Sequence, residues 1–390
     1  MSADSTGGSE AIRRYLDEKS LCQLENNVYL CKNFSDMDLE IKRFSELDIQ
    51  DPFFDSLRAS YPEFNAWFNR KAEAGENAYV FFDEMGWIID FLYLKIEEEE
   101  VSDVVPALPA KRRLKVGTFK LVSRGTRRGE RFMKKIMDRA VAENVDEIYV
   151  TIFPTEELQY LIHSFERFGF EHIANKPHNG GLSEYVLVKD MHSVKNDIIK
   201  DYPFVKRNGV SKHLLSIIPD FHTKLFPDSI LTNESYNLVQ DISSTNSIYK
   251  IYICWMDGVE RLKKGDLLLI YRTSDNKGPA AYRSVATSIC TVDEIRTFHD
   301  FKDCDAFVNY AAPYSIFDTN DLTRWYRTRS NFVVIRMLYN VAFTRKVIRK
   351  TLLEQVGIPA EAYWGFCPLT DQQFEQIIKI GQADERYFIH

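Results

Sequence analysis

A loop rich in arginine and glycine is the stretch of this sequence whose residue types point most directly to chemistry. It follows a predicted strand, opens a predicted helix and consists of Arg124, Gly125, Thr126, Arg127, Arg128, Gly129 and Glu130. Free N–H groups at a helix N-terminus, with the helix macrodipole behind them, attract anions, and glycine lets the backbone approach a ligand closely. The arginine side chains add positive charge. The sequence therefore predicts that this loop binds a diphosphate.

The elements around the loop are those of an α/β sheet. Residues 114–122 (LKVGTFKLV) are predicted to form a strand, and residues 129–143 place their apolar side chains on one face of a helix. Residues 147–153 form a continuous apolar run, as in a strand buried on both faces. A helix at 156–168 and a strand at 184–191 complete this half.

The residues upstream supply further elements of the same sheet. Residues 27–34 alternate like a strand, and residues 37–72 carry apolar side chains at intervals of three and four, which predicts helices. Residues 78–97 read as a hairpin that turns at Asp83–Gly86. The predicted order is β, α, β–β, β, α, β, α, β.

The loop motif RGTRRG resembles the CoA-binding motif R/Q-x-x-G-x-G/A of the GNAT superfamily of N-acetyltransferases. Arg124 and Gly129 match the motif, Gly125 matches its common RG start, and Arg127 stands where the middle glycine usually lies. Downstream, FERFGF (165–170) is similar to the family's Y-x-x-x-GF element, with Phe165 in place of the tyrosine. The resemblance covers roughly residues 27–191.

The resemblance implies acetyl-CoA or another acyl-CoA as cofactor. Backbone groups of Phe119, Lys120 and Leu121 are expected to grip the pantetheine arm, and one N–H there to polarise the thioester carbonyl. Residues 124–130 are expected to hold the diphosphate. An Arg128→Glu variant is expected to lose CoA binding while staying folded.

The acid and the base of the reaction are not evident from the motif. Phenylalanine at position 165 cannot donate a proton to the departing thiolate, which leaves water, another side chain or positioning alone. Candidate groups are Tyr160 and His163 on the helix at 156–168, and the acidic run Glu97–Glu100. A structural or solvated role is the alternative for each of them.

The second half has a different pattern, dominated by short strands. These are predicted at 212–218, 248–255, 266–273, 280–292 and 331–343, with helices only near 292–300, 345–356 and 370–381. The pattern predicts a small twisted sheet or barrel. The fold class is thus a two-domain α/β (α+β) protein, with a frayed segment at 1–26, a GNAT domain at 27–195 and a second domain at 196–390.

The second domain resembles the PUA-like group, which includes ASCH and EVE-type domains. The resemblance rests on KKGDLLLIYRT (263–273), preceded by YICWMDG, and on SKHLLSIIPDFHTKLFPD at the start of the domain. The G-x-K-x-x-E-x-R element of the ASCH type is not found. The resemblance implies a small β-barrel with a pocket for nucleotides or modified bases.

Aromatic and arginine side chains of the second domain suit single-stranded RNA, because rings stack on bases and guanidinium groups hold phosphates. The candidates are Trp255, Tyr271, Arg272, Arg324, Trp325, Arg327 and Arg329. Residues 321–350 carry eight basic side chains against Asp321 alone, in a chain whose net charge is −7. A place in the sheet core is the alternative for Trp255 and Tyr271.

Cysteine spacing and hydropathy argue against three classes of protein: disulfide-stabilised, metal-binding and membrane-spanning. Six scattered cysteines without a CxxC pair predict reduced thiols, and His213 and His222 lack a carboxylate suited to a shared metal, so no metal site is expected. The absence of a long apolar run and of a signal-peptide pattern predicts a cytoplasmic protein without a membrane partner.

The sequence leaves three functions open. The first is an acyl-CoA-dependent N-acyltransferase whose second domain recognises RNA, with tRNA among the possible acceptors. The second is a nucleic-acid-binding regulator whose GNAT fold has lost activity, an alternative that Phe165 and Arg127 support. The third is a protein or small-molecule acetyltransferase whose second half is an interaction module. The acceptor and the oligomeric state do not follow from the sequence.

Overall fold

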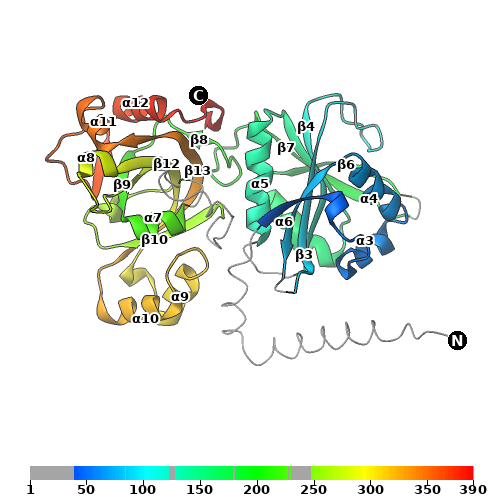
Figure 1. Cartoon of the computed structure of the whole chain (residues 1–390), viewed down its shortest axis with the longest axis horizontal. Helices are drawn as coiled ribbons and strands as arrows, with labels where there is room; N and C mark the ends of the chain where they lie inside the picture. Colours follow the sequence, from blue (N-terminus) through cyan, green and yellow to red (C-terminus); the bar gives the residue numbers. More distant parts are fainter. Residues whose placement is uncertain are drawn as a thin grey trace.

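The computed structural model describes residues 39–83, 85–122, 128–178, 181–226, 229 and 247–389. The predicted frayed segment, the predicted strand at 27–34 and the loop residues Arg124, Gly125, Thr126 and Arg127 lie outside the described residues. Figure 1 shows two domains side by side, each built on its own sheet, with α5 on the side of the first domain that faces the second.

The first domain is built on a seven-stranded sheet in the order β1-β2-β3-β4-β5-β7-β6. Its strands are β1 (Leu39–Arg43), β2 (Asn77–Phe82), β3 (Ile88–Glu97), β4 (Arg113–Leu121), β5 (Glu147–Ile152), β6 (Glu171–Lys176) and β7 (Glu184–Asp190). Neighbouring strands are antiparallel except β4 and β5, which are parallel. A single parallel pair in the centre of the sheet requires the crossover helix that follows β4.

Helices cover both faces of this sheet. The 3-10 helices η1 (Phe44–Glu46) and η2 (Pro52–Phe54) lie on one face with α3 (Asp55–Ser60) and α4 (Phe64–Glu73), around an aromatic core. The other face carries α5 (Arg128–Ala142) and α6 (Gln159–Arg167), with η3 (Glu156–Leu158) leading into α6. The residues of α5 predicted to face the core, from Phe132 to Val141, are buried.

Most elements predicted for the first half are confirmed, with two corrections. The hairpin, β4, α5, β5, α6 and β7 lie where the sequence predicts them, within one to three residues. Residues 39–43, however, belong to a strand and not to the predicted helical stretch, because LEIKR pairs along β2. The strand β6 was not predicted, since four of its six residues are exposed and it lacks a clear apolar alternation.

The second domain contains a six-stranded sheet in the order β10-β13-β12-β11-β9-β14. Its strands are β9 (Lys212–Ile217), β10 (Tyr249–Cys254), β11 (Leu267–Arg272), β12 (Val285–Thr297), β13 (Val333–Ile348) and β14 (Phe366–Leu369). A separate parallel pair joins β8 (Val205–Lys206) to β15 (Phe388–Ile389). The helices are α7 (Pro219–Leu225), α8 (Ala280–Arg283), α9 (Cys304–Ala311), α10 (Thr319–Thr328), α11 (Arg349–Glu354) and α12 (Asp371–Gly381).

The strands predicted for the second half are found, but its helices differ from the prediction. The helix predicted near 292–300 is wrong, because β12 continues to Thr297 in antiparallel pairing with β13 and only Phe298–Asp300 forms a 3-10 turn. Residues 280–283 form α8 instead of the start of a strand, and α9 and α10 were not predicted. The two α-helices predicted at 345–356 and 370–381 correspond to α11 and α12.

None of the helices in the part of the chain that the structure describes combines the length and the apolar character needed to cross a membrane.

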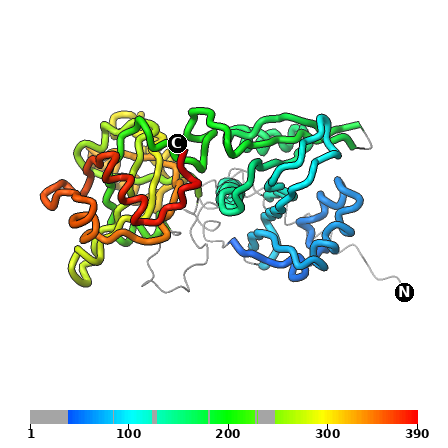
Figure 2. The backbone as a smooth tube through the Cα atoms, turned by 90° about the horizontal axis from the view of Figure 1, so that it is seen from above, coloured from blue at the N-terminus to red at the C-terminus, as the bar shows by residue number. Residues whose placement is uncertain are grey.

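The two domains share one continuous core along α5. Tyr202, Ile248 and Leu338 of the second domain join the apolar cluster that packs α5 and α6 against the first sheet. Figure 2 shows the C-terminal segment running beside this boundary, where Arg386 donates a hydrogen bond to the carbonyl oxygen of Ala142 at 3.0 Å. Removal of residues 196–390 would expose this apolar surface, so the truncated chain cannot serve as a test of activity.

Polar contacts at the same boundary converge on Glu130 in the first turn of α5. Its Oε1 accepts a hydrogen bond from the backbone N–H of Tyr249 at 2.8 Å, and Tyr314 donates a second hydrogen bond to its carboxylate. The hydroxyl of Tyr249 in turn accepts a hydrogen bond from Arg167 of α6 at 2.7 Å. Glu130, predicted to contact a diphosphate, therefore directs its side chain to the second domain.

We predict that Glu130→Ala lowers the free energy of unfolding by about 1–3 kcal/mol, because two donors at the domain boundary lose their acceptor. Urea denaturation of the full chain measures the change. Glu361, an exposed residue of the second domain, provides the control, since Glu361→Ala should alter stability by no more than about 0.5 kcal/mol. Equal stability of the two variants would show that Glu130 does not hold the domains together.

Candidate functional site

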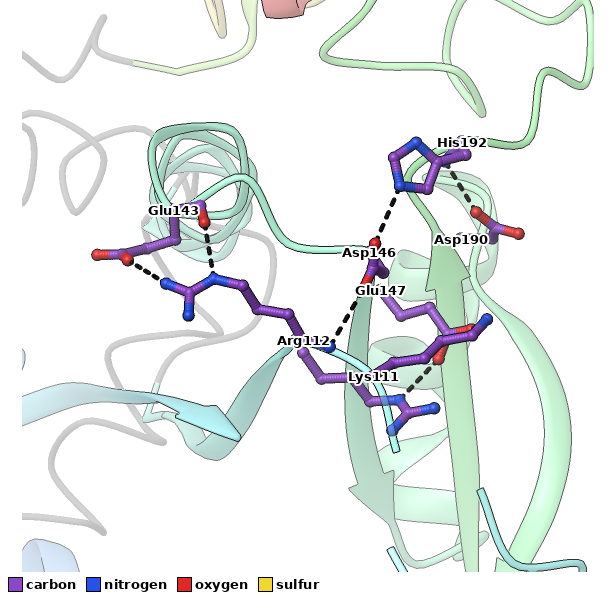
Figure 3. A network of polar contacts seen from close by, with 8 residues as sticks. Lys111, Arg112, Glu143, Asp146, Glu147, Asp190 and His192 are labelled. Atoms are coloured by element: carbon purple, nitrogen blue, oxygen red, sulfur yellow. Dashed lines mark hydrogen bonds and ion pairs between the residues drawn. The ribbon is translucent and has the colours of Figure 1, made fainter. Parts of the chain in front are cut away.

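A charged network closes the amino-terminal ends of the parallel strands β4 and β5 (Figure 3). Arg113 of β4 donates to Glu147 of β5 at 2.7 Å, and Lys111 forms an ion pair with the second oxygen of the same carboxylate. The backbone N–H of Arg112 donates to Asp146 at 3.1 Å. Because Arg113 is 1% exposed, this pairing is held in a dry environment and fixes the two strands at this end.

The opposite ends of the same two strands are open. The β4–β5 pairing runs from Arg113↔Glu147 to Val116↔Val150, and no further β4–β5 pair is formed within the described residues. Yet β4 continues to Leu121 and β5 to Ile152. The strands therefore separate beyond Val116, and the facing edge of β4 presents backbone groups that need other partners.

The hydrogen-bond alternation along β4 identifies which backbone groups face this gap. The N–H of Val122 donates to the carbonyl oxygen of Ile89 on β3 at 2.9 Å, so these two residues form a hydrogen-bonded pair. In an antiparallel ladder such pairs alternate with pairs whose backbone groups point away. The backbone of Lys120 therefore bonds to β3, whereas the N–H and C=O groups of Phe119 and Leu121 point into the gap.

The side chain of Lys120 binds β4 to η2 and α3, the helices that cover one face of the first sheet. Its Nζ donates to the Ser56 hydroxyl at 2.7 Å and to the carbonyl oxygen of Phe53, and it lies 4.5 Å from the centre of the Phe53 ring. Burial lowers the pKa of Lys120 to about 8. Of the three residues predicted to grip a pantetheine arm, Phe119 and Leu121 thus present their backbones, while Lys120 holds the strand in place.

A buried aspartate joins the two ends of the predicted phosphate loop. Asp90 on β3 is fully buried, and its Oδ1 accepts a hydrogen bond from the N–H of Val122, the residue before the loop, at 3.2 Å. Its Oδ2 pairs with the guanidinium of Arg128, the first residue of α5. Burial, only partly opposed by Arg128, raises the pKa of Asp90 to about 7. One carboxylate therefore sets the width of the loop at its base.

This contact corrects the role predicted for Arg128. Its side chain is 5% exposed and points to Asp90, so its charge serves the base of the loop and not a ligand. An Arg128→Glu chain would place a second acidic side chain against Asp90 in a dry site, so we expect it to be destabilised by about 3–5 kcal/mol. Next to it, Gly129 packs closely on β4, since a Cβ there would lie 3.0 Å from Leu121 Cδ1.

The candidate acid and base residues are His163 and Tyr160 of α6. Within the described residues, neither is seen to contact the backbone of β4 at the gap between β4 and β5. His163 has a side chain that is 72% exposed and pairs with Glu166 of the same helix at 3.0 Å. Tyr160 is 36% exposed. Phe165 is fully buried, with its ring centre 5.6 Å from that of Phe119 and 4.9 Å from that of Phe170.

The acidic run at the end of β3 begins with two residues that make structural contacts, Glu97 and Glu98. Glu97 accepts hydrogen bonds from Lys95 at 3.1 Å and from the hydroxyl of Tyr149, and these partners lower its pKa although burial opposes them. Glu98 pairs with Arg112 of the charged network. Glu97 also lines a cavity of about 410 Å³ beside α4.

A polar cluster that sequence reasoning missed lies where β5 ends. Glu184, the first residue of β7, accepts a hydrogen bond from the hydroxyl of Tyr61 at 2.8 Å and pairs with His178 Nε2 at 2.9 Å. The ring centre of Phe153 lies 5.9 Å from that of Tyr61 and 5.1 Å from that of His178. Tyr61 and Glu184 are 123 residues apart, so only the fold reveals the cluster.

The nucleic-acid candidates of the second domain divide into two groups. Tyr271 and Arg272 line a cavity of about 930 Å³ together with Arg349 and Trp364. The Arg349 guanidinium lies 4.2 Å from the centre of the Trp364 ring, and Tyr271 packs beside that ring with the centres 5.4 Å apart. Tyr271 is 1% exposed and belongs to the core of the sheet, which confirms the alternative stated for it, and Trp364 is 9% exposed. The cavity therefore offers mainly cationic side chains beside the edge of one buried ring.

The second group lies at α10, and none of its residues lines the cavity. The rings of Trp255 and Trp325 pack edge to face with their centres 5.5 Å apart, and Arg329 lies 4.6 Å from the Trp255 ring. Arg327 is exposed, and Arg324 pairs with Asp321 of the same helix at 2.5 Å. Among the residues described, no group of three or more His, Cys, Asp or Glu side chains is placed to hold a metal ion.

Comparison with protein-family models gives no match, and no curated protein matches this sequence. Among solved structures, the chain is similar to NAA60 of Arabidopsis thaliana in complex with a bisubstrate analogue, at 13% identity and a TM-score of 0.30, over 40% of this chain and 99% of that chain. It is also similar to Naa20 of Chaetomium thermophilum, at 15% identity and a TM-score of 0.28, over 42% of this chain and 87% of that one. The ASCH protein of Zymomonas mobilis aligns at 8% identity and a TM-score of 0.30, over 43% of this chain and 94% of that one.

The raised pKa of Asp90 gives stability a defined pH dependence. Folded Asp90 keeps its proton up to about pH 7, whereas the unfolded chain releases it near pH 4. Protonation therefore stabilises the folded chain below about pH 7, and this contribution is lost as the pH rises.

We predict that the wild-type chain loses roughly 1 kcal/mol more unfolding free energy than Asp90→Asn between about pH 6 and pH 8. Urea denaturation at each pH measures the difference, and Asn retains the side-chain oxygen that accepts from Val122. Parallel pH curves for the two chains would show that Asp90 is ionised in the fold throughout this range.

Proposed function

We propose that the first domain is a GNAT-type N-acyltransferase, which transfers an acyl group from acetyl-CoA or another acyl-CoA directly to an amine. The observation that carries this proposal is the separation of β4 and β5 beyond Val116, which leaves the backbone groups of Phe119 and Leu121 facing a gap. A pantetheine arm, which contains two amide groups, can pair with these groups as a short strand would. NAA60 of Arabidopsis thaliana was solved in complex with acetyl-CoA, a ligand of the class proposed for this chain.

The N–H groups that face the gap also supply the electrophilic assistance. A backbone N–H of Phe119 or Leu121 can donate to the thioester carbonyl oxygen, where negative charge develops as the amine attacks. Because Phe165 is buried and has no hydroxyl, the departing thiolate takes its proton from water. Direct transfer requires that the two reactants are held in line, and the rigid edge of β4 provides that alignment.

The diphosphate of CoA is proposed to bind the loop between Val122 and Arg128. The start of α5 lies directly beside β4, as the packing of Gly129 on Leu121 requires, and its N-terminal amides suit an anion. With Arg128 engaged by Asp90, the proposed cationic contacts of the loop are Arg124 and Arg127, which lie outside the described residues.

We predict that an Arg124→Glu, Arg127→Glu double variant binds CoA at least about 10-fold more weakly than the wild type, because two cations near the diphosphate become anions. Isothermal titration calorimetry with CoA measures the affinity, and the thermal unfolding temperature should change little. Arg345→Glu, an exposed charge reversal on β13, is the matched control. An unchanged CoA affinity of the double variant would contradict the loop assignment.

The second domain is proposed to bind RNA in the cavity beside Trp364, so that the acceptor is an amine on tRNA, an aminoacyl end or an RNA-associated protein. Arg272 and Arg349 supply the phosphate pairing that a single-stranded nucleotide uses, beside the edge of the Trp364 ring. Trp255, which follows β10, and Trp325 of α10 pack on each other outside this cavity.

We predict that Arg349→Ala weakens the binding of total tRNA about 10-fold and lowers the slope of log affinity against log salt by about one unit, because one phosphate contact is lost. Fluorescence anisotropy across a salt series measures both quantities. Arg324→Ala, which removes an exposed arginine of α10, should leave them unchanged. The opposite ranking of the two variants would place RNA on α10.

The alternatives differ in whether free CoA is released. A regulator that has lost activity would bind RNA without thiol release from acetyl-CoA, whereas a transferase acting on RNA would release thiol when total RNA is added. A protein or small-molecule transferase would release thiol without RNA.

A further inference from the structure

We propose that His178, oriented by Glu184 and Tyr61, is the group that removes a proton from the acceptor amine. This inference rests on the proposed acyl transfer and adds the catalytic residue that the sequence did not identify. It follows from the contacts, the burial and the position of the polar cluster at the end of β5.

In this cluster a carboxylate, Glu184, orients an imidazole, His178, that can act as a base. The Glu184 side chain is 3% exposed and holds His178 Nε2 at 2.9 Å, while the His178 side chain is 31% exposed. The hydroxyl of Tyr61 occupies the other carboxylate oxygen at 2.8 Å. A carboxylate that accepts from Nε2–H fixes the tautomer, which leaves the lone pair on Nδ1. His178 therefore offers a fixed, partly accessible proton acceptor.

The other imidazole–carboxylate pairs in the described ranges lack this burial. His163 pairs with Glu166, whose side chain is 48% exposed, and His192 pairs with Asp146, whose side chain is 44% exposed. Both of these carboxylates face solvent and do not hold the ring through a desolvated contact. Within the part of the chain that the structure describes, only His178 pairs with a buried carboxylate.

Strand register places the cluster at the level of the gap where the acyl group is proposed to lie. Ile152 pairs with Tyr185, so Glu184 lies opposite Phe153, the residue that follows β5. The β4–β5 ladder ends at Val116↔Val150, and three further residues in the same register would bring Phe119 level with Phe153. The base would thus lie beside the backbone groups that polarise the thioester, and Tyr61 would approach from the connection between α3 and α4.

The proton balance of the reaction gives His178 a defined task. An alkylammonium acceptor loses two protons when it becomes an amide. We assign one of them to His178 Nδ1, which passes it to solvent, so that the neutral nitrogen can attack the carbonyl carbon. The new C–N bond forms as the C–S bond breaks, the second proton passes from the nitrogen to water, and the departing thiolate takes a proton from water.

Two small acceptors separate proton removal from acyl transfer. Spermidine is charged near neutral pH and must lose a proton before it attacks, whereas hydroxylamine is largely uncharged and needs no such step. With the full chain, acetyl-CoA and each acceptor, thiol release measures the rate. We expect His178→Gln to lower the rate with spermidine by about 100-fold or more and the rate with hydroxylamine by less than about 3-fold, well below the effect of a lost catalytic base.

Glu184→Gln and Tyr61→Phe test the positioning of the imidazole. Both should show the same acceptor-dependent loss as His178→Gln, to a smaller degree, and added imidazole should restore part of the spermidine rate in His178→Gln alone. His172→Gln is the control, because His172 lies in the same hairpin but stacks on Tyr185 and bonds to Asn175. Its rates should equal those of the wild type.

The outcomes distinguish the base from the transferase. An equal loss with both acceptors, no loss with spermidine, or a wild-type chain that uses hydroxylamine alone would each overturn the assignment of His178 while leaving acyl transfer in place. A wild-type chain that binds CoA but releases no thiol with spermidine, hydroxylamine or total RNA would overturn the proposed transferase and His178 with it.

Discussion

The parallel pairing of β4 with β5, closed at one end and open at the other, is the constraint on which the first domain depends. Glu147 draws Arg113 and Lys111 together at the closed end, and pairing stops at Val116. A ladder that continued to Leu121 would satisfy every backbone group of β4 and leave nothing for a ligand. The charged network therefore does more than stabilise the sheet, since it holds the first pair of the ladder that ends at Val116↔Val150.

The first sheet was predictable from sequence because its signals are local. The hairpin at 78–97, the apolar run at 147–153 and the amphipathic face of α5 each follow from residues close together in the chain, and β2, β3, β5 and α5 lie there. Weaker local signals failed. The strand β6 is mostly exposed, and the helix predicted near 292–300 is wrong because antiparallel pairing with β13 keeps β12 extended to Thr297.

The parts of the site that were not predictable depend on contacts between distant residues. The phosphate motif predicts that Arg128 is a ligand-binding cation, but its side chain forms an ion pair with the buried Asp90 of β3. Glu130 looked like part of the same loop, yet its acceptor oxygens face Tyr249 and Tyr314. In each case the motif indicated the right segment, and a tertiary partner decided where the side chain points.

The contacts of Arg128 and Glu130 also show that both domains hold the first turn of α5. Asp90 holds the first residue of α5 against the base of the proposed phosphate loop, while Glu130, two residues on, binds the second domain. Arg167 of α6 donates a hydrogen bond to the same Tyr249. Both α5 and α6 are therefore bonded to Tyr249 of the second domain. A displacement of β10 must therefore move the acceptor oxygens of Glu130 or break their hydrogen bonds, and either change acts on the first turn of α5. The start of that helix is accordingly a point at which hydrogen bonds join the two domains.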